Sequence, residues 1–237
     1  TARPGLAELA ALARKRRVLL IEDLGSGALV DLSQFGLEHE PTVSESLAAG
    51  VDVVTCSGDK LLGGSQAGLI LGRRRPLESI RRDPLARVLR ADKLALAALE
   101  ATLPLYADPA RAAAEIPVLT MLKADAAMLR GRAERLAALL MERWPHAQVG
   151  VVESEGESGG GSMPDVRLPG WAVALNLPDF TAQAIERLAR QADPPVIGTI
   201  RGARFRLDVR TLADEDLPRV ARALAEAVGA SNGPPLP

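Results

Sequence analysis

The chain has 237 residues, a formal net charge of −1 and one cysteine, and 47% of its residues are hydrophobic. This composition is sufficient for one large domain or two small ones with an aliphatic core, and the near-zero charge gives no support for nucleic-acid binding through bulk electrostatics. A single cysteine excludes an internal disulfide and indicates a reducing compartment, so we expect a cytoplasmic protein without membrane spans.

The first third of the chain alternates helix and strand patterns. Residues 6–17 have the periodicity of an amphipathic helix, and residues 18–21 form a continuous apolar run that is typical of a parallel strand buried on both faces. A short helix at 42–49 precedes strands at 51–56 and 69–71. This alternation predicts an α/β fold with a mainly parallel sheet.

The rest of the chain completes the first domain with helices and then predicts a second, smaller α/β domain. In order, we expect an interrupted helical region (76–106, broken at Pro84 and Pro104), a long helix (115–144), a strand (147–153), a flexible glycine- and serine-rich loop (156–164), a strand (171–177), a helix (182–192), a hairpin (196–200 and 203–209) and a final helix (214–228) capped by Asp214. We place the domains at 1–110 and 111–229, followed by a disordered tail at 230–237.

A lysine surrounded by small residues follows the strand at 51–56. This segment, residues 57–64, is called the Lys60 loop below. Glycines allow a sharp turn and the close approach of a bulky group, and a lysine in such a place can act as a nucleophile or form a Schiff base. The alternative is a glycine-rich turn that carries an ordinary exposed lysine.

An acid follows the strand at 18–21. Asp23 precedes a Gly-Ser-Gly sequence, at the strand end where open α/β sheets place their ligands. A lysine that holds an aldehyde and an acid that pairs with a pyridinium nitrogen are the two groups that pyridoxal phosphate requires. Asp23 could instead cap a helix or an Asx turn.

Longer motifs resemble bacterial selenocysteine synthase, the L-seryl-tRNA(Sec) selenium transferase family. They are EDLGSG at 22–27, SGDKLLGGSQAG at 57–68, RADK at 90–93, LAALEATL at 96–103, PVIG at 195–198 and LDVR at 207–210. The resemblance extends over residues 5–228, and Ser65 stands where we expect a proline. It implies the fold type I architecture of pyridoxal-phosphate-dependent transferases, with residues 1–110 as the C-terminal part of the cofactor-binding large domain.

The resemblance also implies a reaction and roles for particular residues. Seryl-tRNA(Sec) would be converted to selenocysteinyl-tRNA(Sec) with selenophosphate, through an aminoacrylyl intermediate. Lys60 would be the Schiff-base residue and the base for the α-proton, and Asp23 the partner of the pyridinium nitrogen. Asp59 would assist the elimination or seat the substrate, or merely cap a turn.

Three further residues are candidates for binding anions. Ser57 is a candidate for a hydrogen bond to the cofactor phosphate, although a local turn bond is an equal alternative. Arg87 and Arg90 match arginines that hold the anionic selenium donor in the family, and their spacing would place them on one helix face. A solvated basic surface is the alternative. His39 and His146 lack the spacing of metal ligands, so we expect no metal.

In the family, the phosphate-binding loop, the ring-stacking residue and the tRNA-binding region precede the part that this chain resembles. We therefore expect a C-terminal portion of a longer homo-oligomeric enzyme that is inactive alone, and the resemblance implies a ring of dimers. Two alternatives stay open. One is a related pyridoxal-phosphate lyase or transferase that acts on a small amino acid, and the other is a non-catalytic oligomerisation remnant.

Overall fold

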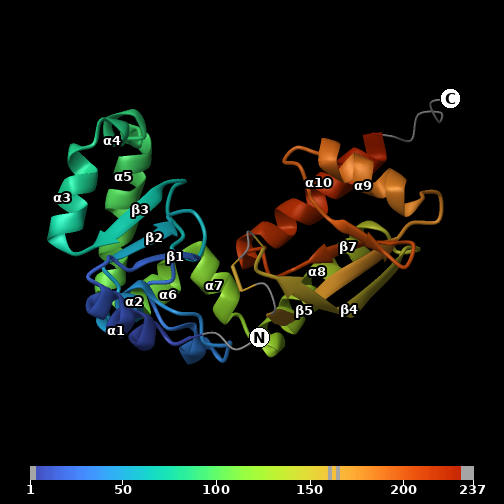
Figure 1. Cartoon of the computed structure of the whole chain (residues 1–237). Helices are drawn as coiled ribbons and strands as arrows, with labels where there is room; N and C mark the ends of the chain where they lie inside the picture. The colour runs from blue at the N-terminus through green and yellow to red at the C-terminus, as the bar shows by residue number, and fades with distance from the viewer. Residues whose placement is uncertain (1–3, 160–161, 164–165, 231–237) are drawn as a thin grey trace. The chain divides into compact units, whose positions relative to one another are not determined.

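The computed structural model describes residues 4–159, 162–163 and 166–230. Contacts divide them into two units, which Figure 1 displays in one view. Unit 1 comprises the described residues of 1–123 and 157–166, and unit 2 comprises those of 124–156 and 167–237. The division follows Lys123, later than the boundary at 110–111 placed from sequence, and the domain assignment stays a prediction.

The helices and strands are given in chain order with the labels of Figure 1. Up to Lys123 they are α1 (Leu6–Arg16), β1 (Ile21–Gly25), the 3-10 helix η1 (Leu32–Phe35), α2 (Val43–Ala49), β2 (Val53–Ser57), β3 (Gly68–Gly72), α3 (Arg74–Arg82), α4 (Pro84–Val88), α5 (Lys93–Thr102), η2 (Leu103–Ala107), α6 (Pro109–Glu115) and α7 (Pro117–Lys123). After Lys123 they are α8 (Ala126–Arg143), β4 (Gln148–Glu157), β5 (Arg167–Asn176), α9 (Ala182–Gln191), β6 (Thr199–Arg201), β7 (Arg204–Asp208), η3 (Asp214–Asp216) and α10 (Leu217–Ala230).

The sheet of unit 1 has the order β1-β2-β3. Strands β1 and β2 are parallel, whereas β3 is antiparallel to β2. The α/β class is therefore confirmed, but the expectation of a mainly parallel sheet is wrong, because the sheet is mixed. The physical reason is the short connection at 58–67, since a parallel neighbour needs a crossover of a dozen or more residues.

One face of this sheet packs on a hydrophobic cluster, and on the other, called the open face below, Asp23 is exposed although Val53 is buried. The buried residues Val54 and Cys56 of β2 form a cluster with Val43 and Val51. Partly buried leucines pack against this cluster, namely Leu6, Leu20, Leu24, Leu29, Leu69 and Leu71. Side chains alternate along a strand, so Asp23 and Thr55 point to the opposite face.

The prediction of a doubly buried strand at 18–21 is wrong. Strand β1 begins at Ile21, and Val18, Leu19 and Ile21 are 60%, 58% and 60% exposed. Among the described residues β1 pairs only with β2, so its other edge is unpaired within this part of the chain. Asp23 consequently lies within the strand rather than after it.

Proline and aspartate set the helix boundaries. The long helix expected at 115–144 consists of two helices, α7 and α8, separated by Ala124 and Asp125. It also begins later than expected, because Ile116 precedes Pro117 and is extended (φ −84°, ψ 116°), as residues before proline prefer. Pro117 begins α7, and Asp125 caps α8 by accepting a hydrogen bond from the Met128 N–H at 2.7 Å. Pro84 likewise begins α4, which confirms the predicted interruption there.

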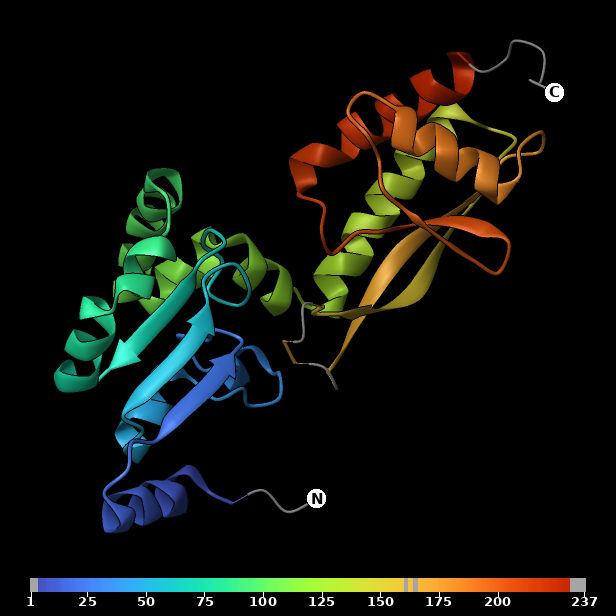
Figure 2. The same cartoon turned by 45° about the horizontal axis from the view of Figure 1, so that its top comes forward.

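Unit 2 contains a sheet of order β4-β5-β7-β6. Helices α8, α9 and α10 lie together on one side of it, as Figure 2 shows, and they share a core with β5 and β7. The core includes Leu129, Leu136, Leu140, Val173, Leu175, Ile185, Phe205, Leu207 and Leu224. The predicted hairpin is confirmed, with Gly202 and Ala203 both at positive φ (58° and 56°) in its two-residue turn.

The final helix begins later than predicted. Asp214 is not its N-cap, because α10 begins at Leu217. Instead, the Asp214 carboxylate accepts hydrogen bonds from Arg132 and pairs with Arg135, at 2.7 and 2.8 Å. These two arginines hold the pKa of Asp214 below its usual value.

Two predicted segments lie partly outside the described residues. Of the tail at 230–237 only Ala230 is described, as the last residue of α10, and the loop at 156–164 lacks positions 160, 161 and 164. Within the described ranges, no helix combines the length and the apolar character that a membrane crossing requires.

Candidate active site

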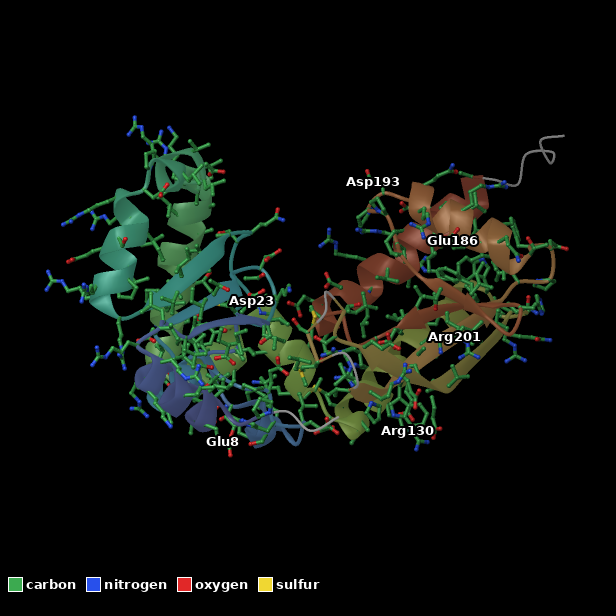
Figure 3. All side chains as sticks on the ribbon, in the orientation of Figure 1. Glu8, Asp23, Arg130, Glu186, Asp193 and Arg201 are labelled. Atoms are coloured by element: carbon green, nitrogen blue, oxygen red, sulfur yellow. The ribbon has the colours of Figure 1, made fainter. Side chains whose placement is uncertain are left out.

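The parallel pairing of β1 with β2 brings the acid and the lysine segment to the same edge of the sheet. Asp23, labelled in Figure 3, is the register partner of Thr55. The Thr55 Oγ1 hydroxyl donates a hydrogen bond of 2.8 Å to Asp23 Oδ1. Asp23 is exposed, so its carboxylate faces the open side of the sheet.

The segments that follow the two strands contact each other through their backbones. The Leu61 N–H donates to the Ser26 carbonyl at 3.1 Å. Gly27 has φ +74°, and a Cβ placed on it would lie 2.3 Å from the Ser57 carbonyl oxygen. Only glycine allows this approach, so the Gly-Ser-Gly sequence fixes the acid strand against the Lys60 loop.

The Lys60 loop is a compact turn. The Gly63 N–H donates to the Lys60 carbonyl at 2.9 Å, and the Gly64 N–H donates to the Gly58 carbonyl at 2.7 Å. Gly63 has φ +72°, and a Cβ there would lie 2.4 Å from Ile116 Cγ2. Lys60 is half-buried rather than fully exposed, which disfavours an ordinary exposed turn lysine.

Two contacts with distant helical segments support this loop. The Tyr106 hydroxyl donates to the Leu62 carbonyl at 2.8 Å, and burial raises the pKa of Tyr106 to about 12, so the donor stays protonated. Ser65, at the position where we expected proline, donates to the Ala95 carbonyl at 2.8 Å. No local pattern indicated either contact, because the partners lie far apart in the sequence.

A surface hollow of ≈ 330 Å³ adjoins the lysine within unit 1. Asp59 and Lys60 line it together with Pro117, Val118, Ser158, Gly159 and Ser162. The sequence predicted only a flexible loop for the glycine- and serine-rich segment. It did not predict that this segment lies beside Lys60, because the composition of the segment carries no signal for that contact. Asp59 itself is exposed.

Four predicted site residues thus lie at one edge of the sheet. Ser57 is the last residue of β2 and shares the open face with Thr55 and Asp23, while Asp59 and Lys60 follow it directly. Their positions are compatible with the roles given above, and those roles stay predictions.

The two arginines are arranged differently from the prediction. Arg87 lies on α4, but that helix ends at Val88, so Arg90 lies outside it and the shared helix face is wrong. Helix α4 is a single short turn that begins at Pro84, and Leu89 already departs from helical geometry (φ −90°, ψ 7°). Both arginines are exposed, and neither forms an ion pair with another described residue.

Comparison with solved structures defines the class of fold. The D-glucosaminate-6-phosphate ammonia-lyase structure matches with a TM-score of 0.53 at 18% identity, over 98% of this chain and 55% of that one. Such a likeness concerns the fold alone, and it confirms the expected fold type I architecture. Residues 1–213 match the family model described as "SelA: L-seryl-tRNA selenium transferase". The chain belongs to this family.

Curated relatives bear the same name. The L-seryl-tRNA(Sec) selenium transferase of Nitratidesulfovibrio vulgaris is 48% identical over 225 residues, which are 94% of this chain and 48% of the relative. The enzymes of Hyphomonas neptunium and Moorella thermoacetica are 47% and 46% identical, over 94% and 96% of this chain and 48% and 49% of their own lengths. The chain thus spans about half the length of the curated relatives that it matches.

Proposed function

We propose that this chain carries the lysine and acid of a pyridoxal-phosphate-dependent L-seryl-tRNA(Sec) selenium transferase, which converts seryl-tRNA(Sec) to selenocysteinyl-tRNA(Sec) with selenophosphate. The observation that carries the proposal is the fixed contact between the Asp23 strand and the Lys60 loop, in a chain of this family. The chain spans about half the length of its relatives, so it need not contain every group that the activity requires. We therefore propose it as one part of the working enzyme.

The residues at the sheet edge fit the cofactor chemically. Lys60 supplies a primary amine that can bond the aldehyde carbon, and Asp23 supplies a carboxylate on an open face. Among the described residues only Thr55 donates to that carboxylate, through Oδ1. Oδ2 is therefore available to accept the N–H of a protonated ring nitrogen. Ser57 provides a hydroxyl on the same face for a phosphate oxygen.

When bound, pyridoxal phosphate would withdraw electrons from the α-carbon of the esterified serine. Residues of this chain would carry out the remaining proton transfers and hold the substrate. Asp23 would hold the proton at the ring nitrogen, and the Lys60 amine would accept the proton of the α-carbon. Asp59 would assist the elimination of the β-hydroxyl or would seat the serine.

The selenium donor is an anion, and Arg87 and Arg90 are suited to hold it. Both guanidinium groups are exposed and unpaired within the described part of the chain, so their charges and donors are available. Because Arg90 lies beyond the end of α4, the two would approach the oxyanion from adjacent segments rather than from one helix face.

Oligomer formation and location belong to the same proposal. Leu85, Val88, Leu89 and Leu94 are 63%, 77%, 78% and 78% exposed, and exposed apolar groups of this kind favour burial in an interface. We infer a cytoplasmic homo-oligomer, such as a ring of dimers. Light scattering on the full-length protein tests this, and a monomer at micromolar concentration would contradict it.

Cofactor attachment tests the central assignment. Full-length wild-type protein and Lys60→Ala are mixed with pyridoxal phosphate, reduced with borohydride, digested and analysed by mass spectrometry. We expect the reduced cofactor on Lys60 in the wild type and on no equivalent site in the variant. Lys93→Ala is the matched control, since it removes an exposed lysine elsewhere in unit 1. Labelling that survives Lys60→Ala would refute the assignment.

A substrate comparison separates the proposed enzyme from the small-molecule alternative. Radiolabelled selenophosphate is supplied with either seryl-tRNA(Sec) or free serine. Label transfer to the tRNA-bound amino acid alone supports the selenium transferase. Transfer to free serine would favour the lyase or transferase of small amino acids. Absence of both reactions, together with failure of borohydride to trap the cofactor on Lys60, would favour the non-catalytic remnant.

A further inference from the structure

The residue that contacts Asp23 lies on the neighbouring strand. Thr55 and Asp23 are register partners in the β1–β2 pair, and their side chains point to the same face. The Thr55 hydroxyl donates to Asp23 Oδ1 at 2.8 Å, across 32 positions of sequence. Thr55 lies two residues before Ser57 and five before Lys60. Strand β2, which leads into the Lys60 loop, therefore also contributes the hydroxyl that contacts Asp23 on β1.

The hydroxyl of Thr55 has no comparable role in packing. Position 54 and position 56 of the same strand point into the buried cluster, whereas Thr55 is half-buried on the open face. A valine would fit the pleated strand as well as threonine does. The hydroxyl therefore matters for the carboxylate it contacts, rather than for the sheet.

We propose that Thr55 is a positioning residue for Asp23, an inference that rests on the proposed function. A carboxylate on an exposed strand face can rotate about its Cα–Cβ and Cβ–Cγ bonds. A hydrogen bond to Oδ1 restricts that rotation and leaves Oδ2 to accept a hydrogen bond from the ring nitrogen of a bound cofactor. Hydrogen bonds to charged acceptors are the stronger ones, so a single donor is sufficient for this task.

The test uses two substitutions in the full-length protein. Thr55→Val keeps the branched shape and removes the donor, and Thr55→Ser keeps the donor. We expect Thr55→Val to raise the dissociation constant for pyridoxal phosphate about tenfold and to lower kcat without a matching change in KM. Thr55→Ser is expected to restore both values to within about twofold. The cofactor dissociation constant is measured by absorbance, independently of turnover.

A double-mutant cycle decides whether Thr55 acts through Asp23. In an Asp23→Ala background, Thr55→Val is expected to change the dissociation constant no further, because the group that it positions is absent. Equal effects of Thr55→Val in both backgrounds would overturn the inference, as would wild-type affinity in Thr55→Val. The unfolding temperature of the cofactor-free variants should not change, and a clear decrease in Thr55→Val would indicate a structural role instead.

The outcomes distinguish this inference from the proposal on which it rests. If Lys60→Ala and Asp23→Ala both bind pyridoxal phosphate as the wild type does, the proposed function is wrong and this inference is wrong with it. If both variants lose affinity while Thr55→Val retains it, the function stands and only the role of Thr55 is refuted.

Discussion

The hydroxyl group of Tyr106 holds the backbone carbonyl of Leu62 at 2.8 Å, and it lies 3.3 Å from that of Leu61. The single tyrosine of the chain therefore fixes the two residues that directly follow Lys60. Both leucines are almost fully buried. The half-buried lysine is thus anchored on its C-terminal side by a contact that crosses more than forty positions of sequence.

Tyr106 gives a prediction about alkaline pH. Its pKa is raised from 10 to about 12 by burial. Between these values the unfolded state loses the proton while the folded state keeps it, so stability should fall as the pH rises through this window. The tyrosinate absorbance of wild type minus that of Tyr106→Phe should titrate with a midpoint near 12, and a midpoint at 10 would contradict the burial of this hydroxyl.

The same substitution should also weaken the fold at neutral pH. Tyr106→Phe leaves the Leu62 carbonyl without this donor, which should reduce the free energy of unfolding by about 1 kcal/mol. Urea denaturation measures the change. Removal of the exposed Thr102 hydroxyl by Thr102→Val, which breaks only a bond within helix α5 to the Ala98 carbonyl, is the comparison. An effect of Tyr106→Phe no larger than that of Thr102→Val would contradict the anchoring role.

Gly63 should not tolerate a side chain. Gly63→Ala combines φ +72° with a Cβ that would lie 2.4 Å from Ile116 Cγ2, and it should destabilise unit 1 by about 2 kcal/mol or more. Gly68→Ala is the matched control, because a Cβ there meets nothing within 4 Å. Thermal unfolding should separate the two variants clearly. Equal melting temperatures would show that the turn can shift to accept the methyl group.

Asp52 stabilises the end of the sheet at which β2 begins, opposite the end that carries the candidate site. Its carboxylate accepts the Leu20 N–H at 2.9 Å and pairs with Arg73, also at 2.9 Å, while the residue itself is only 8% exposed. Asp52→Ala should cost about 2–3 kcal/mol, because it leaves a backbone N–H and a guanidinium without their acceptor. Arg73→Ala should cost less than about 1 kcal/mol, since that side chain is 58% exposed.

Denaturant titrations of the two variants test this asymmetry. Because dissolved ions screen the charge of the exposed Arg73 side chain, the loss of unfolding free energy caused by Arg73→Ala should be smaller in 1 M salt. The effect of Asp52→Ala should persist there, since the lost backbone hydrogen bond does not depend on screening. Similar losses in the two variants would mean that the ion pair, rather than the backbone contact, is the main contribution of Asp52.

The exposed arginines should influence the selenium donor more than the tRNA. Arg87→Ala and Arg90→Ala are each expected to raise the KM for selenophosphate about tenfold, as loss of a charge-assisted contact does, with the KM for seryl-tRNA(Sec) nearly unchanged. Arg81→Ala removes an equally exposed arginine from the last turn of α3 and is the control. An equal effect of all three substitutions would indicate general charge rather than a donor site.

The sequence predicted those features that depend on neighbouring residues. These are the helix expected at 42–49, the interruption at Pro84 and the hairpin at Gly202, all of which follow from local chemistry. The direction of β3 could also have been inferred, because the connection at 58–67 is too short for a parallel crossover.

The remaining features depend on partners that are distant in sequence. Nothing near Tyr106 indicates that its hydroxyl reaches Leu62, and nothing near Ser65 indicates Ala95. The exposure of residues 18–21 similarly depends on which other segments cover them, and the apolar composition of this run does not specify those segments. For the site, strand order and the lysine motif placed Asp23 beside the Lys60 loop, but the contact with Thr55 required the register of the two strands.

The supports of the Lys60 loop have a consequence for folding. The loop takes its shape from Ser26, Ala95 and Tyr106, so its native form cannot arise before these separate parts of the chain have assembled. In a nascent or partly unfolded polypeptide, Lys60 would be an ordinary solvated amine. Stable capture of an aldehyde at this position would therefore report a completed fold, and would distinguish native molecules from misfolded ones during biosynthesis.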